Sequence, residues 1–301
     1  MRTSVLINTC NHGAFIGDCL DSVFRQTRPP DEIVVYDDGS TDGTLALLRG
    51  RRETFTLIAA GEQSRRTGQQ NQAHAIDQAF RRSTGDLVFL LDGDDLFLPD
   101  KIARYAAAAQ SGEGTLPVLV QAPVIQIDGD SRRQPYQPES FRQTADALAT
   151  AYARQDADLF FPTSALAFSR TFLERVLPMS WADGLSLWSD VRLTCAALLA
   201  GRIVGLPEPL TLWRRHAGSL TLADDASRGR RVRLTWQRTQ LFNRLATAAG
   251  KPTLSVWRNR RFYRQLARML FPWPGNVLAR RAARKTEGAL RSDNPDHAHH
   301  R

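Results

Sequence analysis

Three carboxylates follow a short apolar run in the segment Leu87–Asp95, which reads Leu-Val-Phe-Leu-Leu-Asp-Gly-Asp-Asp. The apolar run has the length of a strand that is buried on both faces of a parallel sheet. On an extended chain, Asp92 and Asp94 point the same way at the strand end where open α/β sheets bind ligands. Two such carboxylates need a cation, and oxygen ligands suit Mg²⁺ or Mn²⁺, which also bridge a diphosphate. An acidic turn that caps the next helix, after Pro99 and Asp100, is the alternative that the triplet alone leaves open.

A second acidic turn, Asp37–Asp38, also follows an apolar segment. Strands and helices alternate in the pattern of the first hundred or so residues, which predicts a parallel sheet with right-handed crossovers. Turns that follow parallel strands lie at one edge of the sheet, so the two acidic turns should meet. In chain order, the expected elements are strand Ser4–Ile7, helix Phe15–Phe24, strand Glu32–Tyr36, a helix carrying Leu45 to Leu48, strand Phe55–Ala59 and helix Gly68–Arg82.

The order and spacing of these segments resemble family 2 glycosyltransferases of the GT-A fold. The most specific block is Asp37–Thr44, which reads Asp-Asp-Gly-Ser-Thr-Asp-Gly-Thr. It is far more specific for the family than an Asp-x-Asp triplet alone. Two departures stand out: Asn8–Asn11 reads Asn-Thr-Cys-Asn where the family often has Pro-Thr-Tyr-Asn, and Asp77 stands where relatives often have Asn. The first departure removes the tyrosine that would stack on a nucleotide base. The other matching segments are Val5–Asn11, Leu20–Thr27 and Gly85–Asp95.

The resemblance implies an α/β chain of the GT-A class, with a Rossmann-like mixed sheet flanked by helices, that binds a nucleotide-diphosphate sugar together with Mn²⁺ or Mg²⁺. By position, Thr9 and Asn11 would line the nucleoside pocket. Asp38 would accept a hydrogen bond from the base imide, which favours a UDP- or dTDP-sugar. Asp92 would reach the ribose or the metal, and Asp94 would be the principal metal ligand. From the residues alone, two alternatives remain open: turn chemistry for Thr9 and Asn11, and an Asx-turn or a helix cap for Asp38.

The middle of the chain is expected to supply the acceptor side. Val118–Ile127 is predicted to form a pair of strands, and Phe160–Arg170 a strand that runs into a helix. A long amphipathic helix is predicted from Leu187 onward, and the family places its general base at the start of such a helix, which here matches Asp190. An inverting transfer needs one carboxylate to take the proton of the acceptor hydroxyl, and a helix N-terminus favours the ionised form. A first-turn acid that only caps the helix is the structural alternative.

A histidine is the last candidate site residue. The segment Leu212–Thr221 resembles the Tyr-Arg-x-His-x-x-Ser segment of the family, with Arg214, His216 and Ser219 at the matching positions. Relatives place this histidine near the metal or the diphosphate, so His216 is expected to be a metal ligand beside Asp94. A lone histidine is more often structural, and the flanking match is what favours function here.

The charge of the chain is divided unevenly. The net charge is +9, but residues 228–301 hold 18 Lys and Arg against 3 Asp and Glu, a net charge of +15. Residues 1–227 hold 22 basic and 28 acidic residues, a net charge of −6. Such an asymmetry indicates an anionic partner for the C-terminal part.

A basic amphipathic helix is predicted over 255–271, where Phe262, Leu266 and Leu270 recur every four residues among arginines. This pattern is typical of an element that lies in a membrane interface, and the alternative is a helix that packs its apolar stripe on the catalytic domain. The expected division is a GT-A domain over 1–225, with a nucleotide-sugar half 1–110 and an acceptor half 111–225, then a basic helical extension 226–291 and a disordered tail 292–301.

No signal peptide, membrane-spanning run or disulfide framework is recognisable, so the cytoplasm is the expected location, with peripheral attachment to the inner face of the cell membrane left open.

The leading hypothesis is an inverting, metal-dependent hexosyltransferase that moves a sugar from a UDP- or dTDP-sugar to a glycan or lipid-linked acceptor, in bacterial surface glycan or polysaccharide synthesis. A nucleotidyltransferase acting on a sugar phosphate would need a phosphate loop rich in Gly and Arg or Lys, and Asn8–Gly13 contains neither cation. A non-catalytic basic surface-binding module leaves the acidic turns unexplained. Nucleic acid is not an expected partner, because an acidic cleft repels phosphodiesters.

Overall fold

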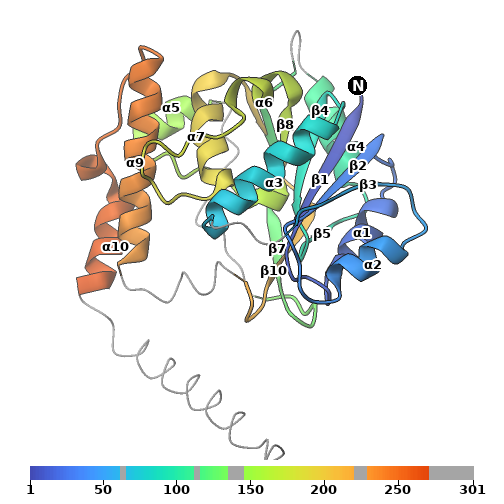
Figure 1. The fold of residues 1–301 in the computed structure, drawn as a ribbon. Helices are drawn as coiled ribbons and strands as arrows, with labels where there is room; N and C mark the ends of the chain where they lie inside the picture. The colour runs from blue at the N-terminus through green and yellow to red at the C-terminus, as the bar shows by residue number, and fades with distance from the viewer. Residues whose placement is uncertain (62–65, 112–115, 135–145, 220–228, 271–301) are drawn as a thin grey trace, which may run out of the picture.

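The computed structural model describes residues 1–61, 66–111, 116–134, 146–219 and 229–270. The predictions for residues 226–228, for 271–291 and for the tail 292–301 lie outside the described residues. Within the described part, a large sheet forms the centre of the molecule and helices cover both of its faces (Figure 1).

The large sheet is mixed, as the resemblance implied. Its strands are β1 (Thr3–Thr9), β2 (Glu32–Asp37), β3 (Thr56–Ala59), β4 (Leu87–Asp92), β6 (Leu119–Gln121), β8 (Leu166–Ser169) and β9 (Ile203–Gly205). They lie in the order β3-β2-β1-β4-β8-β6-β9. The first four in this order are parallel, β8 runs antiparallel to both of its neighbours, and β6 and β9 are parallel. The parallel half therefore confirms the alternation read from the first hundred residues.

Alternating side chains of the parallel strands enter two separate cores, because successive residues of a strand face opposite sides of the sheet. Val5 and Ile7 of β1 pack with the helices on one face, whereas Leu6 packs with those on the other. On the first face lie α1 (Ile16–Phe24), α2 (Thr44–Gly50) and α4 (Lys101–Gln110), and on the second α3 (Gly68–Arg82), α6 (Arg170–Val176) and α7 (Ser189–Ala200). This double burial explains why the strands are apolar runs rather than alternating patterns.

The carboxyl ends of the central strands lie side by side. In the register of the sheet, Thr9 of β1 is paired with Asp37 of β2, and Asn8 is paired with Asp92 of β4. The two acidic turns therefore start from the same edge of the sheet, as their positions after parallel strands predicted.

A second, three-stranded sheet lies below this edge (Figure 1). It consists of β5 (Leu96–Phe97), β10 (Thr211–Arg215) and β7 (Val124–Asp128), in that order. The predicted pair of strands over 118–127 is therefore wrong in its pairing: β6 joins the large sheet and β7 the small one. Pro123 stands between them, and a proline interrupts the ladder of backbone donors.

The predicted strand over 160–170 is shorter than expected. Only Leu166–Ser169 is a strand, and it is preceded by a single 3₁₀ turn, Thr163–Ala165. Pro162 comes immediately before the turn, and Phe160, Phe161 and Pro162 line a pocket instead of extending the sheet.

The C-terminal helices lie beside α7 (Figure 1). They are α9 (Arg230–Ala248), a 3₁₀ turn at Val256–Arg258 and α10 (Arg260–Leu270), and α5 (Ala147–Arg154) lies nearby. Phe242 of α9 shares a core with Leu187 and Cys195 at α7. The second helix was predicted to begin at Ser255, but it begins at Arg260, because the Asn259 side chain accepts hydrogen bonds from the first free backbone amides.

The first member of the predicted Phe262-Leu266-Leu270 stripe is buried inside the extension. Phe262 is only 4% exposed and packs against Trp257 of the preceding turn, while Leu270 is exposed. Phe262 is therefore not available to a membrane surface, and its ring contacts lie within the extension. No helix among the described residues is long and apolar enough to cross a membrane.

Candidate active site

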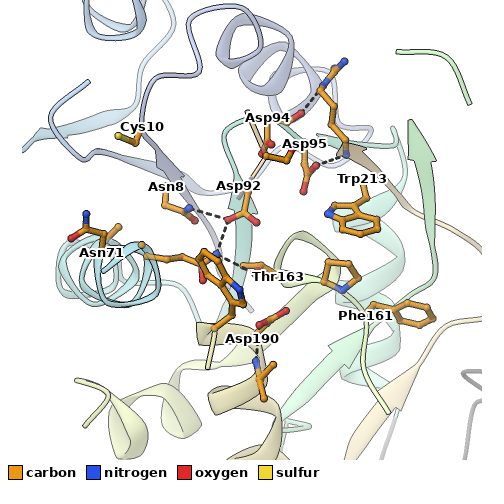
Figure 2. Close-up of a pocket in the computed structure, with 18 of the residues that line it drawn as sticks. Asn8, Cys10, Asn71, Asp92, Asp94, Asp95, Phe161, Thr163, Asp190 and Trp213 are labelled. Atoms are coloured by element: carbon orange, nitrogen blue, oxygen red, sulfur yellow. Dashed lines mark hydrogen bonds between the residues drawn. The ribbon is translucent and has the colours of Figure 1, made fainter. Parts of the chain in front are cut away.

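The structure brings all seven predicted site residues to a single pocket of about 780 Å³ at the carboxyl edge of the large sheet. They come from the ends of β1, β2 and β4, from the start of α7 and from the end of β10. In Figure 2, Asp92 and Asp190 reach the pocket from β4 and α7, on two different sides. The residues that line it include Thr9, Asn11, Asp38, Asp92, Asp94, Asp190 and His216.

Asp92 is held by two amide side chains. Its Oδ1 atom accepts hydrogen bonds from Asn8 Nδ2 at 2.9 Å and from Gln72 Nε2 at 3.1 Å (Figure 2). Burial, together with the nearby Asp94, raises the pKa of Asp92 to about 7. Nothing in the described chain donates a hydrogen bond to the buried Oδ1 atom of Asn8. Asn8 and Asp92 thus present acceptor oxygens to a hydroxyl-bearing ligand.

Gln72 connects the end of β4 with the start of α7 across the pocket, a role that sequence reasoning missed. Its Nε2 atom donates to Asp92 and, at 3.3 Å, to Thr163 Oγ1. Its Oε1 atom accepts from the backbone amide of Ser189, the residue before Asp190, at 3.4 Å. A glutamine at this place in α3 carries no motif signal, because all three partners are distant in sequence.

Three side chains form a cluster that can hold a divalent cation. The ligand atoms of His12, Asp94 and His216 lie within 4.8 Å of one another, and Asp94 Oδ2 lies 3.1 Å from His216 Nε2. Burial raises the pKa of Asp94, but the hydrogen bond from His216 and the nearby His12 outweigh it and leave this pKa below its ordinary value. Asp92 is not a member of this cluster.

His12 is the site residue that the sequence prediction missed. Burial lowers the pKa of His12, which favours the neutral imidazole that a metal ion requires. The residue lies in the polar turn Asn8–Gly13, and only the turn composition could have drawn attention to it. Two imidazoles and one carboxylate suit Mn²⁺ better than Mg²⁺, which prefers oxygen ligands alone.

A buried network sets the distance between Asp94 and His216. Asp95, the third carboxylate of the triplet, accepts a hydrogen bond from the backbone amide of Arg214 at 2.7 Å, and Arg214 Nε donates to the Asp94 carbonyl at 2.8 Å (Figure 2). Phe15 was expected to be the first residue of α1, but it precedes the helix, and its ring centroid lies 4.5 Å from that of His216. These contacts tie β10 to the end of β4, so His216 arrives beside Asp94.

Gly93 is required by the close approach of β1. A Cβ atom at this position would lie 2.7 Å from Thr9 Oγ1 and 3.0 Å from His12 Nδ1, and Thr9 is buried. We therefore expect Gly93→Ala to displace the His12 and Asp94 side chains and to weaken Mn²⁺ binding by at least about tenfold. Overpacking should also lower the free energy of unfolding by about 1–3 kcal/mol. Titration of Mn²⁺ measures the first effect and urea denaturation the second.

The matched control is Gly43→Ala, because a Cβ atom at Gly43 meets nothing within 4 Å. Mn²⁺ affinity of Gly93→Ala equal to that of Gly43→Ala would show that the turn absorbs the methyl group without moving the ligands.

Asn11 links two loops as well as lining the pocket. It has a left-handed backbone, with φ of 57°, which asparagine tolerates better than most residues. Its Oδ1 atom accepts from the backbone amide of Thr41 at 2.8 Å, and Gly13 donates its amide to Asp42 at 2.9 Å. The turn chemistry left open for Asn11 is therefore present. Thr9 is buried, and its Oγ1 atom lies 3.3 Å from a ring nitrogen of His12.

Asp38 lies at the end of β2, buried but lining the pocket. Burial raises its pKa, although the neighbouring His74 and Arg66 act in the opposite direction. The helix-cap alternative finds no support, because α2 begins at Thr44 after Gly43, and Asp42 accepts the hydrogen bond from the Thr44 amide at 2.9 Å.

Asp190 is the second residue of α7. It therefore lies in the first turn, where the helix N-terminus stabilises a carboxylate. Its Oδ1 atom accepts a hydrogen bond from the amide of Val191 at 2.7 Å, and burial raises its pKa to about 6. A carboxyl group with this pKa is mostly ionised at neutral pH and is still basic enough to take a proton.

The C-terminal helices contribute charged groups to the same pocket. Arg238 of α9 contacts Asp158 at 2.7 Å, and Arg261 of α10 also forms an ion pair with Asp158. All three residues line the pocket, as Asp190 does, and Arg238 lowers the pKa of Asp190. One side of the pocket is therefore built partly from the basic extension.

Comparison with known sequences identifies a family and several relatives. A model described as glycosyl transferase family 2 matches residues 4–177, which ends before Asp190 and His216. An uncharacterized glycosyltransferase from Nostoc sp. is 30% identical over 228 residues, 73% of this chain and 66% of the relative. A poly(ribitol-phosphate) beta-glucosyltransferase from Bacillus spizizenii is 27% identical over 107 residues, 35% of this chain and 17% of the relative. The chain thus spans less than two thirds of the length of either relative.

Solved structures share the fold. The structure of residues 1–349 of Staphylococcus aureus TarS in complex with UDP-GlcNAc superposes with a TM-score of 0.62 at 18% identity, covering 89% of this chain and 72% of that one. At this identity the likeness shows the fold, which is the GT-A arrangement predicted from the sequence.

Proposed function

The chain belongs to glycosyl transferase family 2, and we propose that it transfers a sugar, with inversion, from a UDP- or dTDP-sugar to the hydroxyl group of a glycan or lipid-linked acceptor. The observation that carries this proposal is that Asp190 lines the same pocket as the His12-Asp94-His216 cluster, although Asp190 and the cluster come from different elements of the fold. A base and a diphosphate site that face one cavity are what a single displacement at an anomeric carbon requires.

The donor would lie along the carboxyl edge of β1, β2 and β4. Asp38 would accept a hydrogen bond from the base imide, and the oxygens of Asn8 and Asp92 would accept from the ribose hydroxyls. TarS, which shares the fold, has been solved with UDP-GlcNAc, and this supports a nucleotide-sugar donor.

The diphosphate would lie against His12, Asp94 and His216. These residues fit a divalent cation, for which we propose Mn²⁺, because two of the three ligands are imidazoles. When bound there, such an ion offsets the negative charge that develops on the departing diphosphate.

In the proposed step, the acceptor oxygen forms a bond to the anomeric carbon while the bond from that carbon to the diphosphate oxygen breaks. Asp190 takes the proton of the acceptor hydroxyl, and the nucleoside diphosphate leaves with the electron pair. Attack from the side opposite the leaving group inverts the anomeric configuration.

We propose that residues 111–225 form the acceptor half and that the basic extension completes it through Arg238 and Arg261. The relative that is named as a poly(ribitol-phosphate) beta-glucosyltransferase supports a polymer hydroxyl as one class of acceptor.

A donor screen tests the proposal without knowledge of the acceptor. Nucleotide sugars are added with Mn²⁺, and thermal unfolding and slow donor hydrolysis are followed. We expect UDP- or dTDP-sugars at a hundred times their Kd to stabilise the chain by about 2.7 kcal/mol, and GDP- and ADP-sugars to have a much smaller effect. Formation of pyrophosphate from UTP or dTTP with a sugar phosphate would instead identify a nucleotidyltransferase and overturn the proposal.

A further inference from the structure

The exposed large apolar side chains gather on one part of the molecule. Among the described residues, Trp236 is 39% exposed, Trp257 61%, Tyr263 47% and Leu270 58%, and all four belong to the helices after residue 229. Exposed tryptophans are uncommon on a surface that faces only water. Their concentration on α9, α10 and the turn between them indicates a surface with a partner.

Three of these side chains form a group that we call the aromatic patch: Trp236, Trp257 and Tyr263. The ring centroids of Trp236 and Trp257 are 5.9 Å apart, and both Trp257 and Tyr263 contact the buried Phe262, at 5.8 and 6.0 Å. Beside the patch, a shallow groove of about 270 Å³ runs between Trp236 and Trp257. Phe262 therefore anchors the patch to the body, and the other rings stay outside.

The charged residues of the segment that carries the aromatic patch are all basic. Residues 229–270 contain 11 Lys and Arg and no Asp or Glu. Arg238 and Arg261 turn inward to Asp158, whereas Arg258, Arg260 and Arg264 are exposed next to Trp257 and Tyr263 in the chain. Amphipathic rings flanked by arginines match the boundary between lipid headgroups and acyl chains.

We propose that the aromatic patch and its flanking arginines dock this protein on an anionic lipid surface. A symmetric contact with a second copy would bring two all-basic surfaces together, so it is disfavoured by charge. Single-stranded nucleic acid stacks successive bases on aromatic faces, but Trp236 and Trp257 meet at an interplanar angle of 73° and so form no common platform for neighbouring bases. An anionic lipid surface attracts the arginines through its headgroups and accepts the amphipathic rings at the boundary with its acyl chains.

The docking face adjoins the acceptor side of the pocket. Arg261 lines the pocket, and the next residue, Phe262, carries the aromatic patch. A lipid-linked acceptor would therefore reach the pocket from the surface on which the protein lies. This consequence rests on the proposed glycosyltransferase function, whereas the docking itself does not.

Co-sedimentation of the full chain with phosphatidylcholine vesicles, with and without phosphatidylglycerol, tests the docking. We expect binding to the anionic vesicles alone at low salt, weakening as salt rises. Trp236→Ser with Trp257→Ser should lower the partition coefficient by at least about tenfold, and so should Arg258→Gln with Arg260→Gln and Arg264→Gln. The charge-matched control, Arg49→Gln with Arg52→Gln and Arg82→Gln, removes exposed arginines elsewhere and should bind like the unmodified chain.

Circular dichroism and thermal unfolding show whether each variant is folded. If the tryptophan variant does not fold, the arginine variant tests the proposal. Equal binding by all variants, equal binding to neutral vesicles, or no vesicle binding would overturn the proposal. So would a concentration-dependent dimer, or a complex with single-stranded RNA, that the tryptophan variant loses while vesicle binding is unchanged. Failure of the donor screen alone would leave the vesicle result intact, so the two proposals fail separately.

Discussion

Asp94→Asn is expected to abolish the Mn²⁺-dependent binding of UDP while the chain stays folded. Asp94 is the only carboxylate of the His12-Asp94-His216 cluster, and its Oδ2 atom lies 3.1 Å from His216. Asparagine keeps the size of the side chain but removes the negative charge, so a divalent cation loses its strongest partner. We expect the affinity for Mn²⁺ to fall by at least about a hundredfold.

The size of the effect makes the measurement simple. Mn²⁺ present at a hundred times its Kd stabilises the folded chain by about 2.7 kcal/mol, and a hundredfold loss of affinity leaves only about 0.4 kcal/mol at the same concentration. Thermal unfolding with Mn²⁺, with UDP and with both separates metal binding from nucleotide binding. His12→Gln should show the same loss in a weaker form, and this would support the ligand that the sequence did not indicate.

Asp130→Asn is the matched control, because Asp130 is an exposed carboxylate outside the pocket. If Asp94→Asn retained the Mn²⁺ dependence of the unmodified chain, the cluster would be a hydrogen-bonded support for β10 and the cation would bind elsewhere.

Asp190→Asn is expected to keep donor binding and to lose sugar transfer by about a hundredfold or more, which is the usual cost of removing a general base. Asp190 lines the pocket from the start of α7, and asparagine preserves the hydrogen bond to the Val191 amide. Thermal shift with UDP and Mn²⁺ reports donor binding, and the transfer rate with an accepted substrate reports the chemistry.

The pH dependence of kcat/KM provides a second readout for the same residue. Burial raises the pKa of Asp190 to about 6, and a base must be ionised to act. The rate should therefore fall by about tenfold per pH unit below that value and level off above it. Arg238 lowers the pKa of Asp190, so Arg238→Gln should move the midpoint to higher pH.

The control for Asp190 is Asp18→Asn, which changes an exposed first-turn acid of another helix. Near-normal turnover by Asp190→Asn would place the base elsewhere. Asp158 would be the next candidate, because it lines the pocket, while Asp183 is held by both terminal nitrogens of Arg192 at 2.8 and 2.9 Å.

Local patterns in the sequence determined the parallel half of the fold. The doubly buried apolar runs of β1 and β4 have no polar interruption. The helix α3 spans Gly68–Arg82 as predicted, and a capping box of Thr67 and Gln70 fixes its start. The rule that turns after parallel strands share an edge was enough to bring Asp38 and Asp94 together. These features depend on residues that are close in sequence, so they can be predicted from periodicity and from capping residues.

Only the tertiary structure determines which distant segments contact each other, because the periodicity of a segment shows its buried face but not what packs against that face. The cation cluster joins residues 12, 94 and 216, and Gln72 connects Asp92 with α7, so each depends on contacts between distant segments. The arginines of the extension illustrate the same limit. The sequence marked them as a basic surface, but Arg238 and Arg261 turn inward because Asp158 lies opposite, and Phe262 is buried because Trp257 covers it. A helical pattern shows that a face is apolar or charged, and only the folded chain determines what that face meets.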